Sequence, residues 1–282
     1  VKHPAAGQRG HMRGSVAGTA LWGQVPYGFR NGPVPKYHRR QSMSSLRSEL
    51  APMLRLALPV VLAELGWMSM GIVDTIMVAP LGPAAIGAVG IGTSLHMAFS
   101  IFGMGVLLGL DTLVSQAYGA GRIDDCHRWL VHGAVLSLGV AVPVTLLLFL
   151  LTSLLDRWGL DPTVHLLTRP YLDVVVWSVL PLLLYATFRR YLQGMGIVRP
   201  VMIALVSANL VNVLVNWVLI YGKLGAPAMG VRGAAWATVL SRVMMAGYLF
   251  VVILQRERGR RPGLFETSLA IDPAWMRRLL AL

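Results

Sequence analysis

The stretch GWMSMGIVDTIMVAP at residues 66–80 places one carboxylate, Asp74, inside a long run of apolar residues. An ionisable side chain is costly to hold in hydrocarbon, so such residues normally face the interior of a helix bundle or a water-filled cavity. A carboxyl group removed from water tends to keep its proton near neutral pH, and it can bind and release that proton or trade it for Na⁺. The alternative is structural, with Asp74 accepting hydrogen bonds that hold neighbouring helices together.

The stretch NLVNVLVN offers neutral polar groups that could accompany such a carboxylate. Asn209, Asn212 and Asn216 follow i, i+3, i+7 spacing and therefore form one narrow stripe on a helix. Amides within a membrane helix must find hydrogen-bond partners, so a packing role is the simpler interpretation. Their oxygens could also bind a cation, provided that Asp74 faces them.

Other side chains could line the same interior. Thr238 adds a hydroxyl to a face of small residues spaced four apart, which lets another helix approach closely. Glu64 lies about 15 Å before Asp74 along a helix and about 80° around it, so the two could line one cavity at different depths. Met70 lies between them, and its flexible thioether would suit a promiscuous pocket, although soft core packing is the commoner role.

The composition shows which kind of fold must position these residues. The chain has 282 residues, of which 55% are hydrophobic and 13% charged, a balance that does not fit a soluble domain of this size. Apolar runs long enough to cross a bilayer core of about 30 Å recur along the chain. They are expected at about 57–79, 86–114, 130–153, 171–193, 200–221 and 231–254. The sequence therefore predicts an all-α polytopic membrane protein with six transmembrane helices.

The positive charges predict the orientation of these spans. The net charge is +13, but Lys and Arg lie in the gaps between apolar runs, which argues against a nucleic-acid partner. Twenty of the 25 Lys and Arg residues fall on one side of the predicted topology, and Arg242 lies within the last span. By the positive-inside rule both ends are then cytoplasmic, in a plasma or inner membrane.

The sequence divides into three parts. Residues 1–45 are basic and rich in Gly and Pro, and they are expected to be disordered. The hypothesis for residues 1–42 is a fragment end or an over-extended translation, because MSSLRSEL begins at Met43. Residues 46–254 hold the six spans. Residues 255–282 are expected to form a cytoplasmic linker and the start of a second bundle, since AWMRRLLAL loosely resembles the PMLRLAL before the first span.

Four segments resemble the N-terminal half of the multidrug and toxic compound extrusion (MATE) transporter family. They are LALPVVLAELGWMSMGIVDTIMVAPLG at 56–82, GLDTLVSQAYGAGR at 109–122, RRYLQGMGIVRP at 189–200, and NLVNVLVNWVLIYG followed by GVRGAAWATVLS. The resemblance covers about residues 46–282. It implies one six-helix lobe of a twelve-helix, two-lobe transporter that exports drugs and organic cations in exchange for H⁺ or Na⁺.

The resemblance also implies roles for individual residues. Asp74 matches the coupling-ion aspartate of the family's first helix, and Pro59 matches the proline at which that helix bends. Asn212 matches a neighbouring asparagine of the fifth helix, whereas Asn216 stands where some members carry a second aspartate. Thr238 corresponds to a ligand on the sixth helix. These four polar residues are therefore the expected coupling-cation site.

The expected mechanism is alternating access. Asp74 takes up H⁺ or Na⁺, its contacts with Asn212 and Asn216 change, and the first helix shifts near Pro59 as the drug is released outward. No other cofactor or metal is expected, and the sequence shows no P-loop or other enzyme signature. The substrate path is expected to involve Glu64, Met70 and Asn209.

The second lobe is missing from the sequence, and two rival functions remain. The chain is expected to be a fragment of a longer protein or, less in keeping with its last residues, a half-transporter that pairs as a homodimer. A lipid-linked precursor flippase of the same superfamily would need several inward-facing arginines, and only Arg242 lies within a span. A non-transporting membrane scaffold would not explain why a carboxylate, Asp74, lies within an apolar span. His96 is interpreted as a hydrogen-bonded buried histidine rather than a proton relay.

Overall fold

The computed structural model describes residues 43–258 and 272–280, and these two ranges are helical with short connections. The segment 1–42, expected to be disordered, and residues 259–271 of the expected linker lie outside the described residues. The helices are α1 (Met43–Val78), α2 (Pro83–Val106), α3 (Gly109–Gly119), α4 (Ile123–Ser153), α5 (Pro162–Val175), α6 (Val179–Gly194), α7 (Arg199–Tyr221), α8 (Val231–Glu257) and α9 (Pro273–Leu280).

Six stretches of helix are long and apolar enough to cross a membrane, which confirms the expected number of spans in the described part of the chain. They are Val61–Leu81, Pro83–Gly119, Ile123–Ser153, Pro162–Gly194, Arg199–Tyr221 and Val231–Glu257. The second span consists of α2 and α3, and the fourth of α5 and α6. The protein is therefore an all-α, multi-pass membrane protein.

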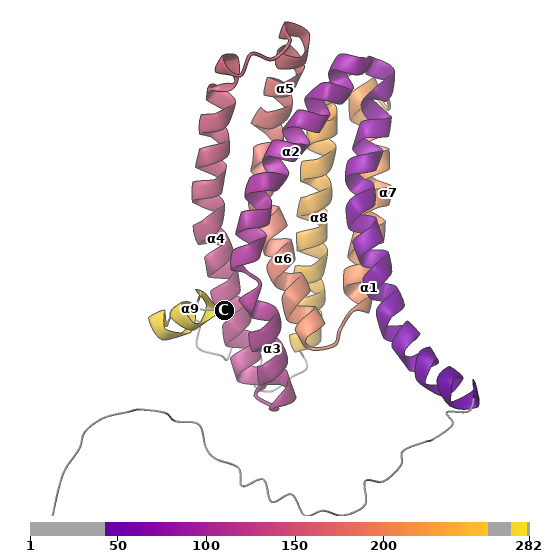
Figure 1. The fold of residues 1–282 in the computed structure, drawn as a ribbon, viewed down its shortest axis with the longest axis vertical. Coiled ribbons are helices and arrows are strands. Elements are labelled where there is room, and N and C mark those ends of the chain that lie inside the picture. Colours follow the sequence, from indigo (N-terminus) through magenta and orange to yellow (C-terminus); the bar gives the residue numbers. More distant parts are fainter. Residues whose placement is uncertain (1–42, 259–271, 281–282) are drawn as a thin grey trace, which may run out of the picture.

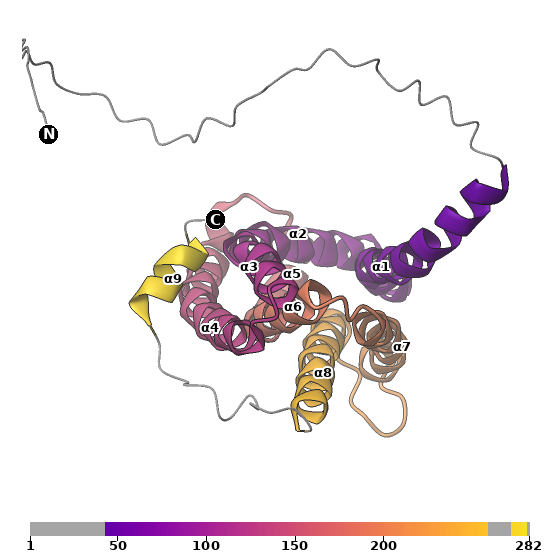
Figure 2. The same ribbon diagram turned by 90° about the horizontal axis from the view of Figure 1, so that it is seen from below.

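The fourth span lies at the centre of the bundle. Of the residues in its most apolar stretch, 72% are buried, against 22% to 50% in the corresponding stretches of the other five spans. In the view from below, α5 and α6 lie among α2, α4 and α8 (Figure 2). At the edge of the bundle α1 packs against α7, which packs in turn against α8 (Figures 1 and 2). The first helix thus lies beside the last two spans, α7 and α8, which are more than 100 residues later in the sequence.

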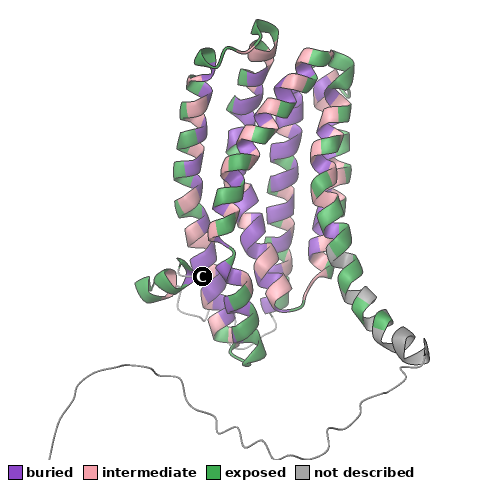
Figure 3. Cartoon of the chain, in the orientation of Figure 1, coloured by how far each residue is buried: buried purple, intermediate pink, exposed green. Residues whose placement is uncertain are grey.

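The burial pattern fits a bundle whose outer surface meets lipid. Buried residues face inward on every span, and exposed residues face outward (Figure 3). Many of the exposed residues are large and apolar, and examples are Ile72, Phe102, Leu146 and Leu210. Exposed apolar surface of this extent is unfavourable in water, and the hydrocarbon of a bilayer is the environment that suits it.

The lower end of the bundle in Figure 1 is called the basic end here. Among the described residues it carries Arg122, Arg128, Arg189, Arg190 and Arg199. Helix α9 docks at this end against α4, where the rings of Trp275 and Trp129 lie 4.3 Å apart. The backbone N–H of Asp272 donates to Nε2 of His132 at 3.0 Å, which fixes the start of α9.

The fourth span begins earlier than the expected residue 171, because the turn LDPT starts a helix. Pro162 is the first residue of α5, and Asp161 caps the helix by accepting hydrogen bonds from the N–H groups of Thr163 and Val164. Proline suits this position because its missing N–H would have no partner in the first turn. The hydroxyl of Thr163 also donates to Asp161, and these bonds hold the pKa of the Asp161 carboxyl below its ordinary value.

Asp161→Ala is expected to lower the melting temperature in a pH-dependent way. A carboxyl whose pKa is lowered on folding contributes stability above its unfolded pKa, about 3.9, and loses that contribution as the pH falls through the folded value. The difference from the wild type should therefore be full at neutral pH and shrink below about pH 4. Asp161→Asn keeps the cap without the charge, so its difference from Asp161→Ala should not vary with pH. Thermal unfolding is measured at neutral pH and below about pH 4. A difference in melting temperature between the wild type and Asp161→Ala that is the same at both pH values would contradict this account.

Candidate functional site

Asp74 lies in the last turns of α1, with its side chain buried between α7 and α8. Its Oδ1 accepts a hydrogen bond from Nδ2 of Asn216 at 2.7 Å, and its Oδ2 accepts one from Oγ1 of Thr238 at 2.7 Å. Nδ2 of Asn216 also donates to Oδ1 of Asn212 at 3.1 Å. The structure therefore brings the four residues of the expected cation site together, from three helices.

The local sequence explains why these side chains converge. Asn212 and Asn216 are four residues apart on α7, so they share a helical face, and both are fully buried. Oγ1 of Thr238 also lies 3.2 Å from the carbonyl oxygen of Ala234, which is an alternative acceptor for its single hydroxyl proton. Ala234 itself is fully buried on the expected small-residue face of α8. The close packing of α7 on α8 then presents an amide and a hydroxyl to one carboxylate.

Two buried polar atoms of this cluster have no hydrogen-bond partner in the described structure. They are Oδ1 of Asn216 and Nδ2 of Asn212. Buried polar groups usually find a partner, and an unpartnered one needs an explanation such as a bound ion. An amide oxygen beside a carboxylate and a hydroxyl is an oxygen donor set that suits a hard cation. The cluster therefore fits either a proton on Asp74 or a small cation beside it.

Asp74 opens onto a cavity of about 290 Å³. The residues that line it are Trp67, Met68, Met70, Gly71, Asp74, Thr93, His96, Met97, Tyr171, Val175, Thr238 and Arg242. Met70 thus lies beside Asp74, as the expected substrate path requires, although only 5% of its surface is exposed. A largely apolar wall with a few polar groups is the usual make-up of a small-molecule site.

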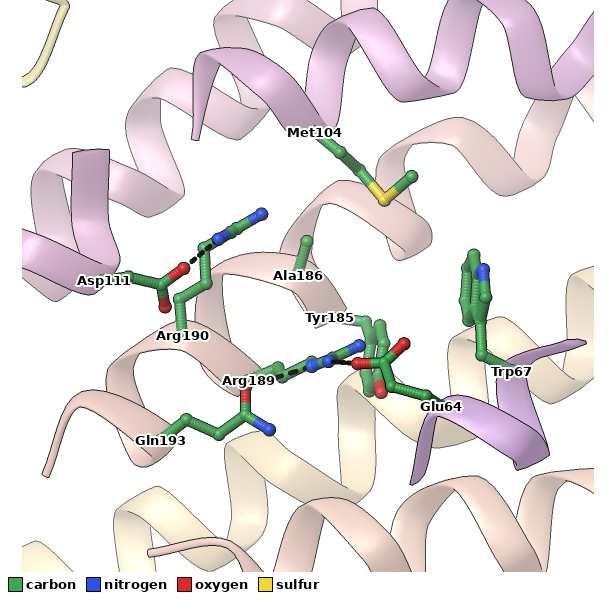
Figure 4. Close-up of a pocket in the computed structure, with 9 residues that line it drawn as sticks. All are labelled: Glu64, Trp67, Met104, Asp111, Tyr185, Ala186, Arg189, Arg190 and Gln193. Atoms are coloured by element: carbon green, nitrogen blue, oxygen red, sulfur yellow. Dashed lines mark hydrogen bonds and ion pairs between the residues drawn. The ribbon is translucent and has the colours of Figure 1, made fainter. Parts of the chain in front are cut away.

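Glu64 lies in a different cavity, of about 280 Å³, toward the basic end (Figure 4). Its carboxylate pairs with the guanidinium of Arg189 on α6, and Arg190 pairs with Asp111 of α3 in the same cavity. The expectation that Glu64 and Asp74 line one cavity is therefore wrong for this structure. The physical reason is the ion pair with α6, a partner that spacing along α1 alone does not reveal.

Asn209 and Pro59 complete the expected set. Nδ2 of Asn209 donates to the carbonyl oxygens of Gly66 at 2.8 Å and Leu205 at 2.9 Å, so this amide joins α7 to α1. Asn209 is not among the residues that line either cavity, and the simpler packing interpretation describes its contacts. Pro59 lies within α1, which is helical from Met43 to Val78, and its side chain lies outside the described residues. The hinge therefore stays a prediction.

A cluster around Arg242 is the main feature of the cavity that sequence reasoning did not assemble. Nη1 of Arg242 on α8 donates to Nε2 of His96 on α2 at 3.1 Å and to Oγ of Ser178. The interpretation of His96 as a buried, hydrogen-bonded histidine is confirmed, since Oγ of Ser100 also lies 3.2 Å from its Nδ1. An arginine within a span was the available signal, but its partners come from helices far away in the sequence.

Comparisons with known proteins identify the family of the chain. The MatE family model matches residues 59–218. The multidrug resistance protein NorM of Photobacterium profundum is 32% identical over 240 residues, which are 85% of this chain and 53% of that protein. The probable multidrug resistance protein NorM of Synechocystis sp. is 31% identical over 235 residues, 83% of this chain and 51% of that protein. The chain thus spans about half the length of these curated relatives.

Solved structures show the same fold. A crystal structure of MATE in the bent conformation superposes with a TM-score of 0.71 at 24% identity, over 80% of this chain and 50% of that one. An outward-facing conformation of a multidrug resistance MATE family transporter gives a TM-score of 0.68, over 81% of this chain and 50% of that one. Because the family model covers more than half of the sequence and the six spans adopt this fold, the chain belongs to the MATE transporter family.

Proposed function

We propose that this chain is the ion-coupling lobe of an antiporter that exports drugs and organic cations. The observation that carries the proposal is the buried Asp74 carboxylate, whose two oxygens are bonded to α7 and α8 while it lines a cavity. An organic cation and a coupling cation are both attracted to this one carboxylate. Since they compete for it, binding of one favours release of the other, which is the basis of exchange.

Protonation of Asp74 would alter a contact between helices. The ionised carboxylate only accepts hydrogen bonds, whereas the protonated form also donates one. Thr238 can turn its hydroxyl proton to the carbonyl oxygen of Ala234, 3.2 Å away, and accept from Asp74 instead. Na⁺ would act differently, by drawing the oxygens of Asp74, Asn216 and Thr238 toward itself. Either ion drives transport only through different affinities in the outward-facing and inward-facing states.

The remaining parts of the proposal concern orientation and partners. The basic end is proposed to face the cytoplasm of a plasma or inner membrane, because the positive-inside rule places the end of a bundle that is rich in Lys and Arg on the cytoplasmic side. The cavity of Asp74 then lies in the outer half of the bilayer. A second six-helix lobe is proposed to close the cleft, contributed either by the rest of a longer chain or by a second copy of this one.

Export by the full-length protein in everted membrane vesicles tests the proposal. A fluorescent organic cation such as ethidium should accumulate in the vesicles when a proton or sodium gradient is imposed in the direction of exchange. Movement of the dye without either gradient, or no movement with both, would contradict ion-coupled export. Movement of a lipid-linked anionic precursor instead would favour the flippase, and no transport at all would favour the scaffold.

Thr238→Val is expected to change the ion affinity of the coupling site without removing the site. Valine has nearly the shape of threonine, but it leaves Oδ2 of Asp74 without its 2.7 Å partner. Loss of a hydrogen bond to a charged group costs about 1.5–3 kcal/mol. For Na⁺, which loses an oxygen ligand, the half-saturating concentration should rise about tenfold or more. For H⁺ it should fall by a similar factor, because the hydroxyl stabilises the ionised carboxylate and its loss favours the protonated form. Thr238→Ser keeps the hydroxyl and should stay close to the wild type. Equal ion dependence of the valine and serine variants would show that the hydroxyl has no part in the site.

A further inference from the structure

Arg242 is a buried cation whose described partners are all neutral. It is 6% exposed, and its Nη1 donates to the imidazole of His96 and the hydroxyl of Ser178. No ion pair within residues 43–258 and 272–280 includes Arg242, and its buried Nε–H has no hydrogen-bond partner. A buried charge without a counter-charge is costly, so the unused donor needs a physical explanation.

His96 does not supply the missing negative charge. Because Nη1 of Arg242 donates to Nε2 of His96, that nitrogen acts as an acceptor and the proton of the neutral ring is assigned to Nδ1, beside Oγ of Ser100. The hydroxyl of Ser178 donates its own hydrogen bond to the carbonyl oxygen of Val175 at 2.6 Å. Histidine and serine therefore orient the guanidinium and leave its charge in place.

Asp74 is not bonded to Arg242 either. Both of its oxygens are taken, by Asn216 and Thr238. Thr238 and Arg242 are four residues apart on α8, which separates their Cα atoms by about 6 Å along the helix axis. The other titratable group that faces the cavity, Tyr171, bonds through its hydroxyl to Oγ1 of Thr93 at 3.0 Å. One cavity therefore holds a carboxylate and a guanidinium that attract each other without a direct ion pair within the described residues.

We propose that Arg242 forms an anion subsite in this cavity, which binds the carboxylate of an amphoteric cargo whose ammonium group faces Asp74. Arg242 lies one helical turn after Thr238, the residue on α8 that bonds to Asp74, and both charges line a cavity of about 290 Å³, which has room for a single-ring compound. Guanidinium binds carboxylate through paired N–H groups, and the Nε–H of Arg242 has no partner among the described residues. The inference rests on the proposed function for the Asp74 side, but anion binding can be measured without transport.

Neutralising Asp74 should act with opposite sign on the two subsites. Without its negative charge the cavity attracts an ammonium less and a carboxylate more, because the nearby repulsion is gone. Removing the charge of Arg242 should do the reverse. This pair of opposite effects separates a site with two charges from a site that merely holds an arginine for packing.

The test is equilibrium binding of two matched probes, benzoate and benzylamine, to the purified full-length protein at neutral pH. Benzoate should bind the wild type about tenfold or more tightly than it binds Arg242→Met, while Arg242→Lys should keep most of the affinity. Asp74→Asn should bind benzoate at least as tightly as the wild type and benzylamine more weakly. Benzyl alcohol, the neutral probe, should not distinguish any of these proteins.

Several outcomes would overturn the inference. One is the absence of saturable benzoate binding by the wild type. A second is equal benzoate affinity in the wild type and Arg242→Met. A third is that benzyl alcohol displaces labelled benzoate from the wild type as well as unlabelled benzoate does. The last comparison uses the wild type alone, so it remains decisive if Arg242→Met does not fold. If benzoate behaves as expected but Asp74→Asn binds benzylamine as tightly as the wild type does, the role proposed for Asp74 is contradicted instead.

Discussion

Asp74→Asn is expected to abolish ion-driven efflux while the protein remains folded in the membrane. Asparagine cannot bind and release a proton and carries no charge to attract Na⁺, so the difference in ion affinity that drives the cycle disappears. Dye movement in vesicles under an imposed gradient should fall to the level of vesicles without the protein. Wild-type efflux by this variant would contradict the proposed role.

The contacts of Asp74 explain why the variant should fold. The amide oxygen of an asparagine can accept from Asn216 as Oδ1 of Asp74 does, at 2.7 Å in the wild type. Its amide nitrogen can donate to Thr238, whose hydroxyl proton then goes to the carbonyl oxygen of Ala234. Glu64→Gln is the matched control, since Glu64 is also a carboxylate of α1 but lies in the other cavity and pairs with Arg189. It should keep ion-coupled efflux.

Gly233→Ala is expected to give the largest loss of stability among single-methyl additions to α8. A Cβ at this position would lie 2.7 Å from the carbonyl carbon and oxygen of Leu219 and 2.9 Å from the backbone nitrogen of Ile220. These are backbone atoms of α7, so they cannot rotate away and the two helices must separate. Overpacking of this kind costs about 1–3 kcal/mol. The shift would also move Asn216 and Thr238 apart, because they lie on the same pair of helices.

Gly247→Ala is the control for this prediction. It adds the same methyl group to the same helix, at an exposed position where no atom lies within 4 Å of the new Cβ. Thermal unfolding of the detergent-solubilised protein should show a lower melting temperature for Gly233→Ala and a wild-type value or higher for Gly247→Ala. Similar melting temperatures for the two variants would contradict the close approach of α7 and α8.

Hydropathy was sufficient to predict the spans, and helical spacing was sufficient to predict the shared face of the asparagines on α7. Hydropathy depends on consecutive residues, so six spans can be counted from the sequence. The fourth span starts earlier than hydropathy predicts, because Asp161 and Pro162 begin a helix where the residue types favour a turn. The face shared by Asn212 and Asn216 follows from their spacing. Their meeting with Asp74 was expected only from the family resemblance, since spacing within α7 does not show which helix it faces.

What could not be predicted depends on which helices pack together. Glu64 pairs with Arg189, which is 125 positions later in the chain, and Arg242 bonds to His96, which is 146 positions earlier. No periodicity within one span links such residues. The central position of α5 and α6 brings these groups together, and that position follows from the packing of all six spans.

The most direct test of the central claim counts the ions released when an organic cation binds to the purified protein. Titration with benzylamine, followed in weakly buffered solution by a pH indicator and a sodium electrode, should release H⁺ or Na⁺ from the wild type, because cargo and ion compete for Asp74. Asp74→Asn should release neither, and Glu64→Gln should release as much as the wild type. Equal ion release by the wild type and Asp74→Asn would show that the coupling ion binds elsewhere.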